Sequence, residues 1–408
     1  MKKIVFLILM VFLASCSTSD GEAGQEATEK DWEEVIDDAT GTEVRLYMWG
    51  GDEGINDYID NFAAPKLKDA YNIELNRIPM DAPDVLQRLQ TERQAGQHNG
   101  SVDVMWINGE NFRNAKERDL LYGSFAQELP NMIEYIDENS LDHQFDFGTE
   151  VEGYEAPWGK VQFVFAYDSD RIDTPPKSFD ELQEWIAENP GKFTYPEATD
   201  FTGNAFLRHL LYAQFNDPES LIELSAEDPL FDEKAEGVWS YLRDIEKDLW
   251  REGQTYPASL TELDRLFQRG EVWMTMGYNE ARVVNKVDEG SFPETTRTFV
   301  LESGSIGNTH FLSIPFNAPN PEGAMVVINE LLSPEAQLEK LNPEGWGENT
   351  VLDMSLLNEE DRVLFEAVNR GDSVLDAQLL NEHFLPELDA HVVPWLEGKW
   401  FENVVSNE

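Results

Sequence analysis

Apolar and polar residues alternate along the first third of the chain in patterns that predict strands and helices in turn. The runs EVRLYMW (43–49), NIELNRIPM (72–80) and SVDVMWING (101–109) predict three strands. Residues 54–71 and 83–95 lie between them and carry apolar side chains at helical spacing. This alternation of strand and helix is typical of a mostly parallel sheet with right-handed crossovers.

The middle of the chain predicts a second unit of the same kind. A strand over 161–167 precedes a helix begun by Ser178, with Glu181 three residues later in a capping-box pattern. Further on, the pattern predicts a helix near 203–214 and a strand in EVWMTMGY (271–278). Residues 297–319 predict a hairpin-like pair of strands, and from Pro321 the pattern is mainly helical.

Length and charge narrow the class of protein. A chain of 408 residues is longer than chains that form a single hydrophobic core, so we expect an α/β protein with two lobes. Its 80 Asp and Glu against 30 Lys and Arg give a net charge of −50. Such a surface repels nucleic acid and anionic membranes, and it is typical of a protein that stays dispersed in high salt.

The first residues predict an export signal. Lys2 and Lys3 precede an apolar run, Ile4–Leu13, that is too short to span a bilayer. The run ends in Leu-Ala-Ser-Cys, which resembles the lipobox of bacterial lipoproteins and makes Cys16, the single cysteine of the chain, the lipidated residue. We expect a signal peptide over 1–15, a flexible tether over 16–30, and a periplasmic or cell-surface protein anchored to a membrane through Cys16.

Five collinear stretches carry a resemblance to a known family. They are YMWGGDEGINDYID (47–60), GSVDVMWINGENF (100–112), GYEAPWGKVQFVFAYDSDRI (153–172), NPGKFTYPEATDFTGNAFLRHLLY (189–212) and NTHFLSIPFNAPNPEGAMVVIN (308–329). Together they resemble the extracellular solute-binding proteins of ABC importers, and more narrowly the YnjB-type family. The resemblance implies a type II periplasmic-binding-protein-like fold, whose two α/β lobes close on a ligand and are then recognised by membrane permease subunits.

Crossover segments would divide the chain between the lobes. We expect lobe one over 42–157 plus 297–318, and lobe two over 158–296 plus 319–408. The hinge would include Lys160–Tyr167 and the return near Arg297–Glu302. A binding protein of this kind is expected to act as a monomer.

Candidate ligand-binding residues cluster where predicted strands end. In open parallel sheets, ligands bind beyond the carboxyl ends of strands, where glycines allow close approach and aromatic rings offer stacking faces. Side-chain amides, a hydroxyl and a carboxylate could add directional hydrogen bonds. The candidates are Trp49, Gly50, Gly51, Asp52, Trp106, Asn108, Trp158, Gln162, Tyr195, Thr202, Gly203, Asn204, Tyr278 and Asn279.

Charge in these loops indicates the class of ligand. The motifs WGGDEG, WINGEN, DFTGN and GYNE contain no Lys or Arg. An anionic solute would therefore lack a cationic partner, so we expect a neutral or cationic organic molecule such as a thiamine-like compound or a polyamine. A carbohydrate or polyol is the alternative, because aromatic faces also stack on sugars.

Motifs of common enzymes are missing from the sequence. The six histidines are scattered without HExxH spacing, and no Gly-Lys pair is followed by Ser or Thr as in a phosphate-binding loop. We therefore expect no catalytic residues, no metal site and no cofactor. A lipid-anchored glycoside hydrolase stays open as another class, because 80 acidic residues allow many carboxylate pairs. A surface adhesin with a large protein partner is a third class.

Overall fold

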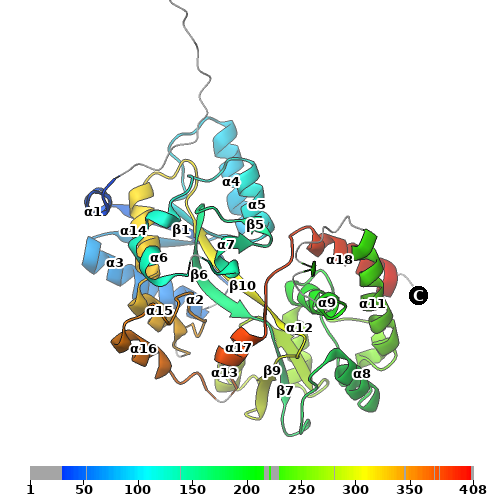
Figure 1. Cartoon of the computed structure of the whole chain (residues 1–408). Coiled ribbons are helices and arrows are strands. Elements are labelled where there is room, and N and C mark those ends of the chain that lie inside the picture. Colours follow the sequence, from blue (N-terminus) through cyan, green and yellow to red (C-terminus); the bar gives the residue numbers. More distant parts are fainter. Residues whose placement is uncertain are drawn as a thin grey trace, which may run out of the picture.

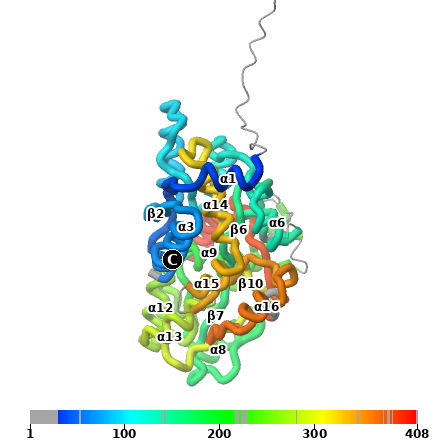
Figure 2. The backbone as a smooth tube through the Cα atoms, turned by 90° about the vertical axis from the view of Figure 1, so that its left-hand side faces the viewer, coloured from blue at the N-terminus to red at the C-terminus, as the bar shows by residue number. Residues whose placement is uncertain are grey.

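The computed structural model describes residues 30–51, 53–137, 139–215, 220–221, 229–279, 281–343, 346–371, 373–375 and 377–405. The predicted signal peptide, Cys16 and the candidate ligand residue Asp52 lie outside the described residues. Figure 1 shows two lobes, with α1, α3 and α14 in one and α8, α9 and α11 in the other. In the turned view of Figure 2, α1, α3 and α14 again lie apart from α8, α12 and α13.

Strands and helices alternate as expected in the first third of the chain. The strands are β1 (Glu43–Met48), β2 (Glu74–Pro79), β3 (Val104–Ile107), β4 (Phe145–Asp146), β5 (Thr149–Glu150), β6 (Glu155–Gln162), β7 (Val164–Asp168), β8 (Met274–Gly277), β9 (Thr296–Phe299), β10 (Ser305–Ser313) and β11 (Phe384–Leu385). The first helices are α1 (Trp32–Ala39), α2 (Glu53–Asp57), α3 (Ala64–Tyr71), α4 (Ala82–Gln94), α5 (Glu110–Glu117), α6 (Pro130–Tyr135), α7 (Leu141–Gln144) and α8 (Phe179–Glu188), with the π-helix η1 (Tyr58–Ala63) and the short η2 (Ala126–Glu128).

The second half of the chain is richer in helices. They are α9 (Phe201–Ala213), α11 (Pro229–Glu246), α12 (Leu260–Gln268), α13 (Arg282–Asp288), α14 (Pro321–Leu331), α15 (Pro334–Leu341), α16 (Glu359–Glu366), α17 (Ala377–Glu382) and α18 (Val392–Trp400), with η3 (Trp250–Gly253) and η4 (Phe401–Val405). No helix in the described ranges combines the length and the apolar character that crossing a membrane requires.

The first sheet is mixed and has the order β11-β10-β3-β1-β2, with β6 added on β10. Strand β1 is parallel to both β2 and β3, which confirms the predicted βαβ start. Strand β10 runs antiparallel to β3 and to β6, and parallel to the short β11. Carboxyl ends of β1 and β3 therefore lie at one edge of this sheet, where the glycine-containing loops follow.

The second sheet is antiparallel, with β7 between β8 and β9. The strand predicted over 161–167 is two strands, because the chain leaves the first sheet after Gln162 and enters the second at Val164. The predicted hairpin over 297–319 is also wrong. Its two strands belong to different sheets, since β9 pairs with β7 and β10 pairs with β6, and the turn between them holds a single bridge, Leu301 to Gly304.

Separate cores stabilise the two lobes. One core joins β1 to α14 and to side chains as distant in sequence as Trp346 and Phe365. The other joins β7 to β9 with α8, α9, α11, α12 and α18. The expectation that all of 319–408 belongs to lobe two is therefore wrong for α14 to α16, whose apolar faces cover the first sheet. Helix α14 packs there against α1 and β1.

The last part of the chain crosses from the first lobe to the second. After α16, residues 367–371, 373–375 and 377–391, called the C-terminal segment below, run through α17 and β11, and α18 then packs in the second core. Strand β11 pairs with the start of β10, at Ser305 and Ile306. In Figure 1 this segment passes between the two lobes. The chain thus connects the lobes three times: between β6 and β7, between β9 and β10, and here.

Candidate functional site

A chain of polar contacts connects loops of the two lobes. Asn108 follows β3, and its Nδ2 donates to Oδ1 of Asn308 on β10, at 3.2 Å. Asn308 Nδ2 lies 3.5 Å from Oε1 of Glu387 in the C-terminal segment. The same carboxylate oxygen accepts from the hydroxyl of Tyr278, which follows β8, at 2.7 Å. Two of the predicted loops, after β3 and after β8, are thereby brought together through Asn308 and Glu387.

Arg208 stands at the second-lobe end of this network. Its side chain is fully buried on α9 and forms an ion pair with Glu387. Its guanidinium carbon lies 5.6 Å from the ring centre of Phe201 and 5.9 Å from that of Phe147. Phe201 begins α9, whereas Phe147 belongs to the β4–β5 turn of the first lobe. One buried cation is therefore held between aromatic rings of both lobes and neutralised by the C-terminal segment.

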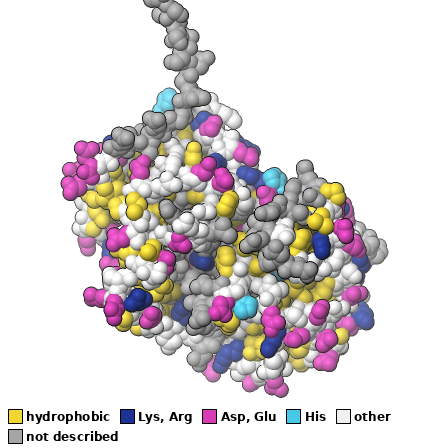
Figure 3. Space-filling view, viewed as in Figure 1, with side chains coloured by type: hydrophobic (Ala, Val, Ile, Leu, Met, Phe, Trp, Pro, Cys, Tyr) yellow, Lys and Arg dark blue, Asp and Glu magenta, His cyan; other side chains and the backbone are white. Residues whose placement is uncertain are grey.

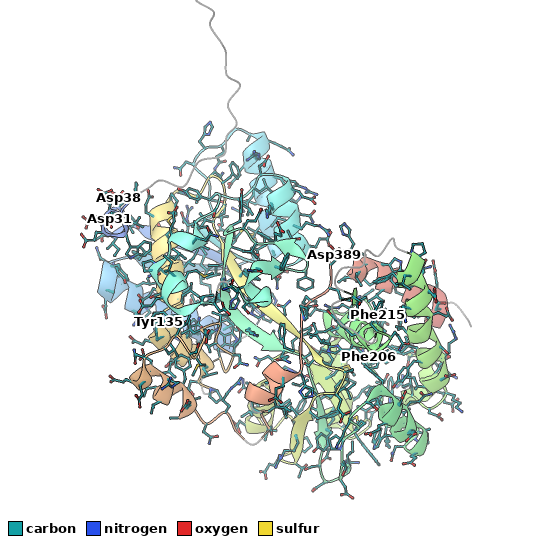
Figure 4. All side chains as sticks on the ribbon, viewed as in Figure 1. Asp31, Asp38, Tyr135, Phe206, Phe215 and Asp389 are labelled. Carbon is teal, nitrogen blue, oxygen red and sulfur yellow. The ribbon has the colours of Figure 1, made fainter. Side chains whose placement is uncertain are left out.

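A cavity of about 220 Å³ opens beside this network. Its walls come from the β4–β5 turn, from β10 and from the C-terminal segment. Four of its lining residues are phenylalanines and three are acids, and the described lining includes no Lys or Arg. The lining residues are Phe145, Asp146, Phe147, Gly148, Gly307, Asn308, Thr309, Phe311, Phe384, Pro386, Glu387 and Asp389. Asp389 is labelled in Figure 4, where the segment passes between the lobes.

One of these acids is tied to the loop after β3. Asp146 is 2% exposed, and its Oδ2 accepts from the backbone amide of Gly109 at 2.6 Å. Burial raises the pKa of this carboxyl well above its usual range, and the Gly109 hydrogen bond lowers it only in part. Gly109 has φ +60°, a left-handed conformation that favours glycine, and an added Cβ would lie 3.3 Å from the Phe147 ring.

The other described candidates, apart from Trp106, fall into two groups, of which the first lies near the surface. Trp49 is 48% exposed, and Gly51 lies so close to its indole ring that an added Cβ would stand 2.3 Å from it. Gly50 accepts through its carbonyl from Asn56 Nδ2 at 3.0 Å. Asn279 has φ 65° and caps its own turn by accepting from the amide of Ala281.

The second group lies in the cores. Candidates that are at most 4% exposed are Trp158, Gln162, Tyr195, Thr202 and Asn204. Tyr195 stacks on Phe206 in the second core, and Gln162 donates to the carbonyl of Leu380. At Gly203 an added Cβ would stand 2.1 Å from the carbonyl oxygen of Glu197, so close backbone packing accounts for this glycine. Position near a strand or helix end does not decide which way a side chain faces.

Trp106 and Trp158 belong to an aromatic cluster of the first lobe. Trp106 is half-buried and lies 5.2 Å from Trp158 and 4.8 Å from the His310 ring. Beneath the cluster, Lys340 donates to the Trp158 carbonyl at 2.7 Å and lies 3.5 Å from Glu348. Burial lowers the pKa of Lys340 to about 8, while Glu348 opposes that change. The cluster is a packed support behind the loop that follows β3.

Two larger hollows, of about 860 Å³ and 710 Å³, open elsewhere on the molecule. Asn308 and Glu387, which connect Asn108 to Tyr278, line neither of these hollows. Among the residues in the described ranges, no group of three or more His, Cys, Asp or Glu is placed to hold a metal ion.

Sequence reasoning missed several residues of the network. Arg208 lies in α9, four residues after the end of the DFTGN motif and about one helical turn away, and outside all four loop motifs. Asn308 stands within β10, and Glu387 follows β11 in a region expected to be helical. Asp146 and Phe147 lie in a two-residue strand and its turn. A signal for Arg208 existed, because an arginine among the apolar residues of FTGNAFLRHLLY predicts a buried charge that needs a carboxylate partner.

Comparison with solved structures defines the class of this fold. The chain is similar to the spermidine/putrescine ABC transporter substrate-binding protein PotD of Streptococcus pneumoniae, with a TM-score of 0.64 and 18% identity over 89% of this chain and 98% of that one. It is also similar to the periplasmic binding protein AfuA of Actinobacillus pleuropneumoniae, solved with fructose-6-phosphate bound, with a TM-score of 0.57 and 15% identity over 90% and 99% of the two chains. The fold is that of the type II periplasmic binding proteins, as expected.

Sequence comparison gives the family. Residues 57–357 match the family described as bacterial extracellular solute-binding protein. The chain is 40% identical to protein YnjB of Escherichia coli strain K12 over 334 residues. This matched region covers 81% of this chain and 85% of YnjB. The chain belongs to this family, and it is a solute-binding protein of an ABC transporter. The predicted resemblance is confirmed.

Proposed function

We propose that this protein captures a compact organic cation in the cavity between the β4–β5 turn, β10 and the C-terminal segment. The observation that carries the proposal is the cavity's lining of phenylalanine rings and carboxylates. Aromatic faces and carboxylates attract ammonium groups, and the acids here outnumber the bases. The volume of about 220 Å³ is below the roughly 300–1,000 Å³ of sites for drug-sized ligands, which favours a small solute.

Arg208 does not oppose this charge preference. Its guanidinium is fully buried behind Phe147 and paired with Glu387, so its charge is neutralised within the protein. Two acids of the cavity, Asp146 and Asp389, form no ion pair with a Lys or Arg in the described part of the chain, and Asp389 Oδ1 lies 2.8 Å from Nδ1 of the exposed His391 ring. The cavity therefore has carboxyl groups left for a cationic solute. PotD, a similar structure, is named for spermidine and putrescine, which are also cations.

Capture would work by closure of two lobes that share three connections. We place lobe one over β1 to β6 with β10 and α14 to α16, and lobe two over β7 to β9 with α8 to α13 and α18. Asn108 on one side and Tyr278 on the other would sense the solute through Asn308 and Glu387. A solute drives closure only if it contacts both sides in the closed form. Permease subunits would then recognise the closed form, and a lipid on Cys16 would hold the protein at the membrane.

Binding of a panel of small cations tests the proposal. The protein without residues 1–15 is screened by thermal shift and titrated by calorimetry with tetramethylammonium, choline, putrescine, glucose and glycerol. We expect the amines to raise the melting temperature and the uncharged polyols to leave it unchanged. Mass spectrometry of solutes that co-purify with the protein gives an independent identification.

Two variants locate the site. Asp389→Asn removes a half-exposed carboxylate of the cavity and keeps its shape, so we expect cation affinity to fall at least about fivefold, as for loss of a binding contact of about 1 kcal/mol. Asp173→Asn removes an exposed carboxylate of the connection between β7 and α8 and should leave affinity unchanged. Equal affinities of all three proteins, or binding of glucose in place of the amines, would contradict the proposal.

A further inference from the structure

Two carboxyl groups of the first lobe, those of Asp146 and Glu155, are buried and interact electrostatically. Asp146 on β4 is 2% exposed and lines the cavity, and Glu155 on β6 has no exposed surface. Within the described part of the chain, neither carboxyl oxygen of Glu155 has a hydrogen-bond partner. The Asp146 side chain accepts a hydrogen bond from the Gly109 amide. Such unpaired burial is costly for ionised carboxylates.

The charged groups around Asp146 and Glu155 do not compensate the cost of ionising both carboxyls. Lys116 on α5 is the base whose field reaches Glu155, but its ammonium is already bound to the Glu152 carboxylate and to the Glu150 carbonyl. Ser313, opposite Glu155 in β10, donates its hydroxyl to the Tyr154 carbonyl.

The other charged neighbours line the two hollows to which the pair belongs, with Asp146 in one and Glu155 in the other. His143, Asp137, Glu150, Glu152 and Asp353 line the 710 Å³ hollow with Glu155. Glu387 and Asp389 line the cavity with Asp146, and Glu387 is already paired with the buried Arg208. These neighbours are therefore mostly acidic.

A proton kept on one of the two carboxyls removes the conflict. Burial raises the pKa of both carboxyls well above their usual range, and the negative charge of Asp146 raises that of Glu155 further. Two interacting acids of this kind lose their protons in coupled steps, so the state of one depends on the charge near the other. A cation beside Asp146 would stabilise the ionised form of the pair.

We propose that the buried carboxyls of Asp146 and Glu155 keep at least one proton in the empty protein, and that a proton is released to solvent when an organic cation enters the cavity. The positive charge of the bound cation then replaces that of the released proton. The two buried carboxyls are therefore never both ionised without a positive charge beside them. Asp146 thereby becomes the residue that selects for positive charge, and Glu155 its proton partner. The exchange rests on the proposed function, whereas proton retention in the empty protein does not.

The empty protein is tested first, because this step needs no ligand. Glu155→Gln keeps the shape of a protonated glutamic acid but cannot ionise. A group whose folded pKa is raised contributes stability that is complete below its unfolded pKa and lost as pH rises through the folded one. We expect the unfolding constant of the wild type, divided by that of Glu155→Gln, to increase between about pH 5 and pH 8, by up to tenfold per pH unit.

Glu150→Gln is the matched control, since Glu150 is exposed on the neighbouring strand β5. Its ratio to the wild type should show no such increase. Urea denaturation at each pH gives the constants. A ratio for Glu155→Gln that stays flat over the whole pH range would overturn proton retention, whatever the ligand is.

Calorimetry with tetramethylammonium chloride then tests the exchange, using two buffers of different protonation enthalpy at one pH. The wild type and Glu150→Gln should release a proton on binding, and their affinity should rise with pH by up to tenfold per unit. Glu155→Gln should bind without proton release, and Asp146→Asn should bind more weakly. Binding to the wild type without proton release would overturn the exchange. No binding at all would contradict the exchange and the proposed cation site together, and the unfolding data would still decide whether the pair holds a proton.

Discussion

At the scale of single residues, the ion pair of Arg208 and Glu387 decides how the C-terminal segment is held. The Arg208 side chain has no exposed surface and the Glu387 side chain is 6% exposed, so each depends on the other for compensation. Tyr278 and Asn308 add hydrogen bonds to the same carboxylate. Removing one partner of a buried pair leaves the other charge uncompensated, and the loss then exceeds that of any surface pair.

Glu387→Gln tests this dependence. The amide keeps the shape of the side chain but leaves the Arg208 charge buried and unbalanced, so we expect the free energy of unfolding to fall by about 3–5 kcal/mol. Urea denaturation measures it. Glu236→Gln is the matched control, because Glu236 pairs with Arg243 on the exposed face of α11 and its loss should cost no more than about 1 kcal/mol. Losses of equal size in the two variants would show that Arg208 has another partner.

At the scale of secondary-structure elements, a buried histidine joins α9 of the second lobe to β10 of the first sheet. His209 Nδ1 lies 2.7 Å from the Ala205 carbonyl, and its Nε2 accepts from the Ile306 amide at 2.9 Å. These contacts require the neutral ring with its proton on Nδ1. Burial lowers the pKa of His209 to about 3.

The lowered pKa of His209 predicts a loss of stability in acid. Because the folded pKa lies below the unfolded value of about 6.5, the contribution is complete above about pH 6.5 and is lost as pH falls towards 3. We expect the stability difference between wild type and His209→Gln to shrink over that range. His98→Gln, in an exposed loop, should show no such trend. Parallel pH curves for His209→Gln and the wild type would show that His209 titrates normally.

The sequence predicted most elements but not how they are shared between the lobes. The N-cap predicted at Ser178 is present, since its hydroxyl accepts from the Glu181 amide, while the Glu181 carboxylate accepts from the Lys177 amide instead of that of Ser178. Two errors concerned β6–β7 and β9–β10, which continue each other in sequence yet belong to different sheets. Periodicity records the local structure of a segment, whereas the sheet that a strand joins depends on partners far along the chain. The same limit explains why α14 to α16 were assigned to the wrong lobe.

The candidate site shows this limit in another form. Asn108 and Tyr278 are brought together as the loop pattern predicted, but the atoms that join them belong to Asn308 and Glu387. Glu387 is 109 positions from Tyr278 in sequence, and no local pattern could place it there. Buried candidates such as Tyr195 were chosen for their residue type, which fits a core as well as a binding site.

At the scale of the whole molecule, negative charge dominates the surface. Figure 3 shows acidic side chains spread over the visible face, with fewer basic ones between them. With a net charge of −50, repulsion among carboxylates opposes the compact state at neutral pH. Repulsion between the carboxylates of the two lobes favours their separation. The three chain connections and the hydrogen bonds and ion pair of Glu387 oppose it.

Screening should therefore stabilise the folded protein. Salt at about 1 M shortens the Debye length to about 3 Å, so repulsion between exposed carboxylates is largely removed, while the buried Arg208–Glu387 pair is hardly screened. We expect the melting temperature at pH 7 to rise between about 0.05 and 1 M KCl. The control is the same series near pH 4.2, the pI of the sequence, where the net charge vanishes and the rise should disappear. A melting temperature at pH 7 that stays constant or falls with KCl would mean that exposed ion pairs contribute more stability than the excess charge removes.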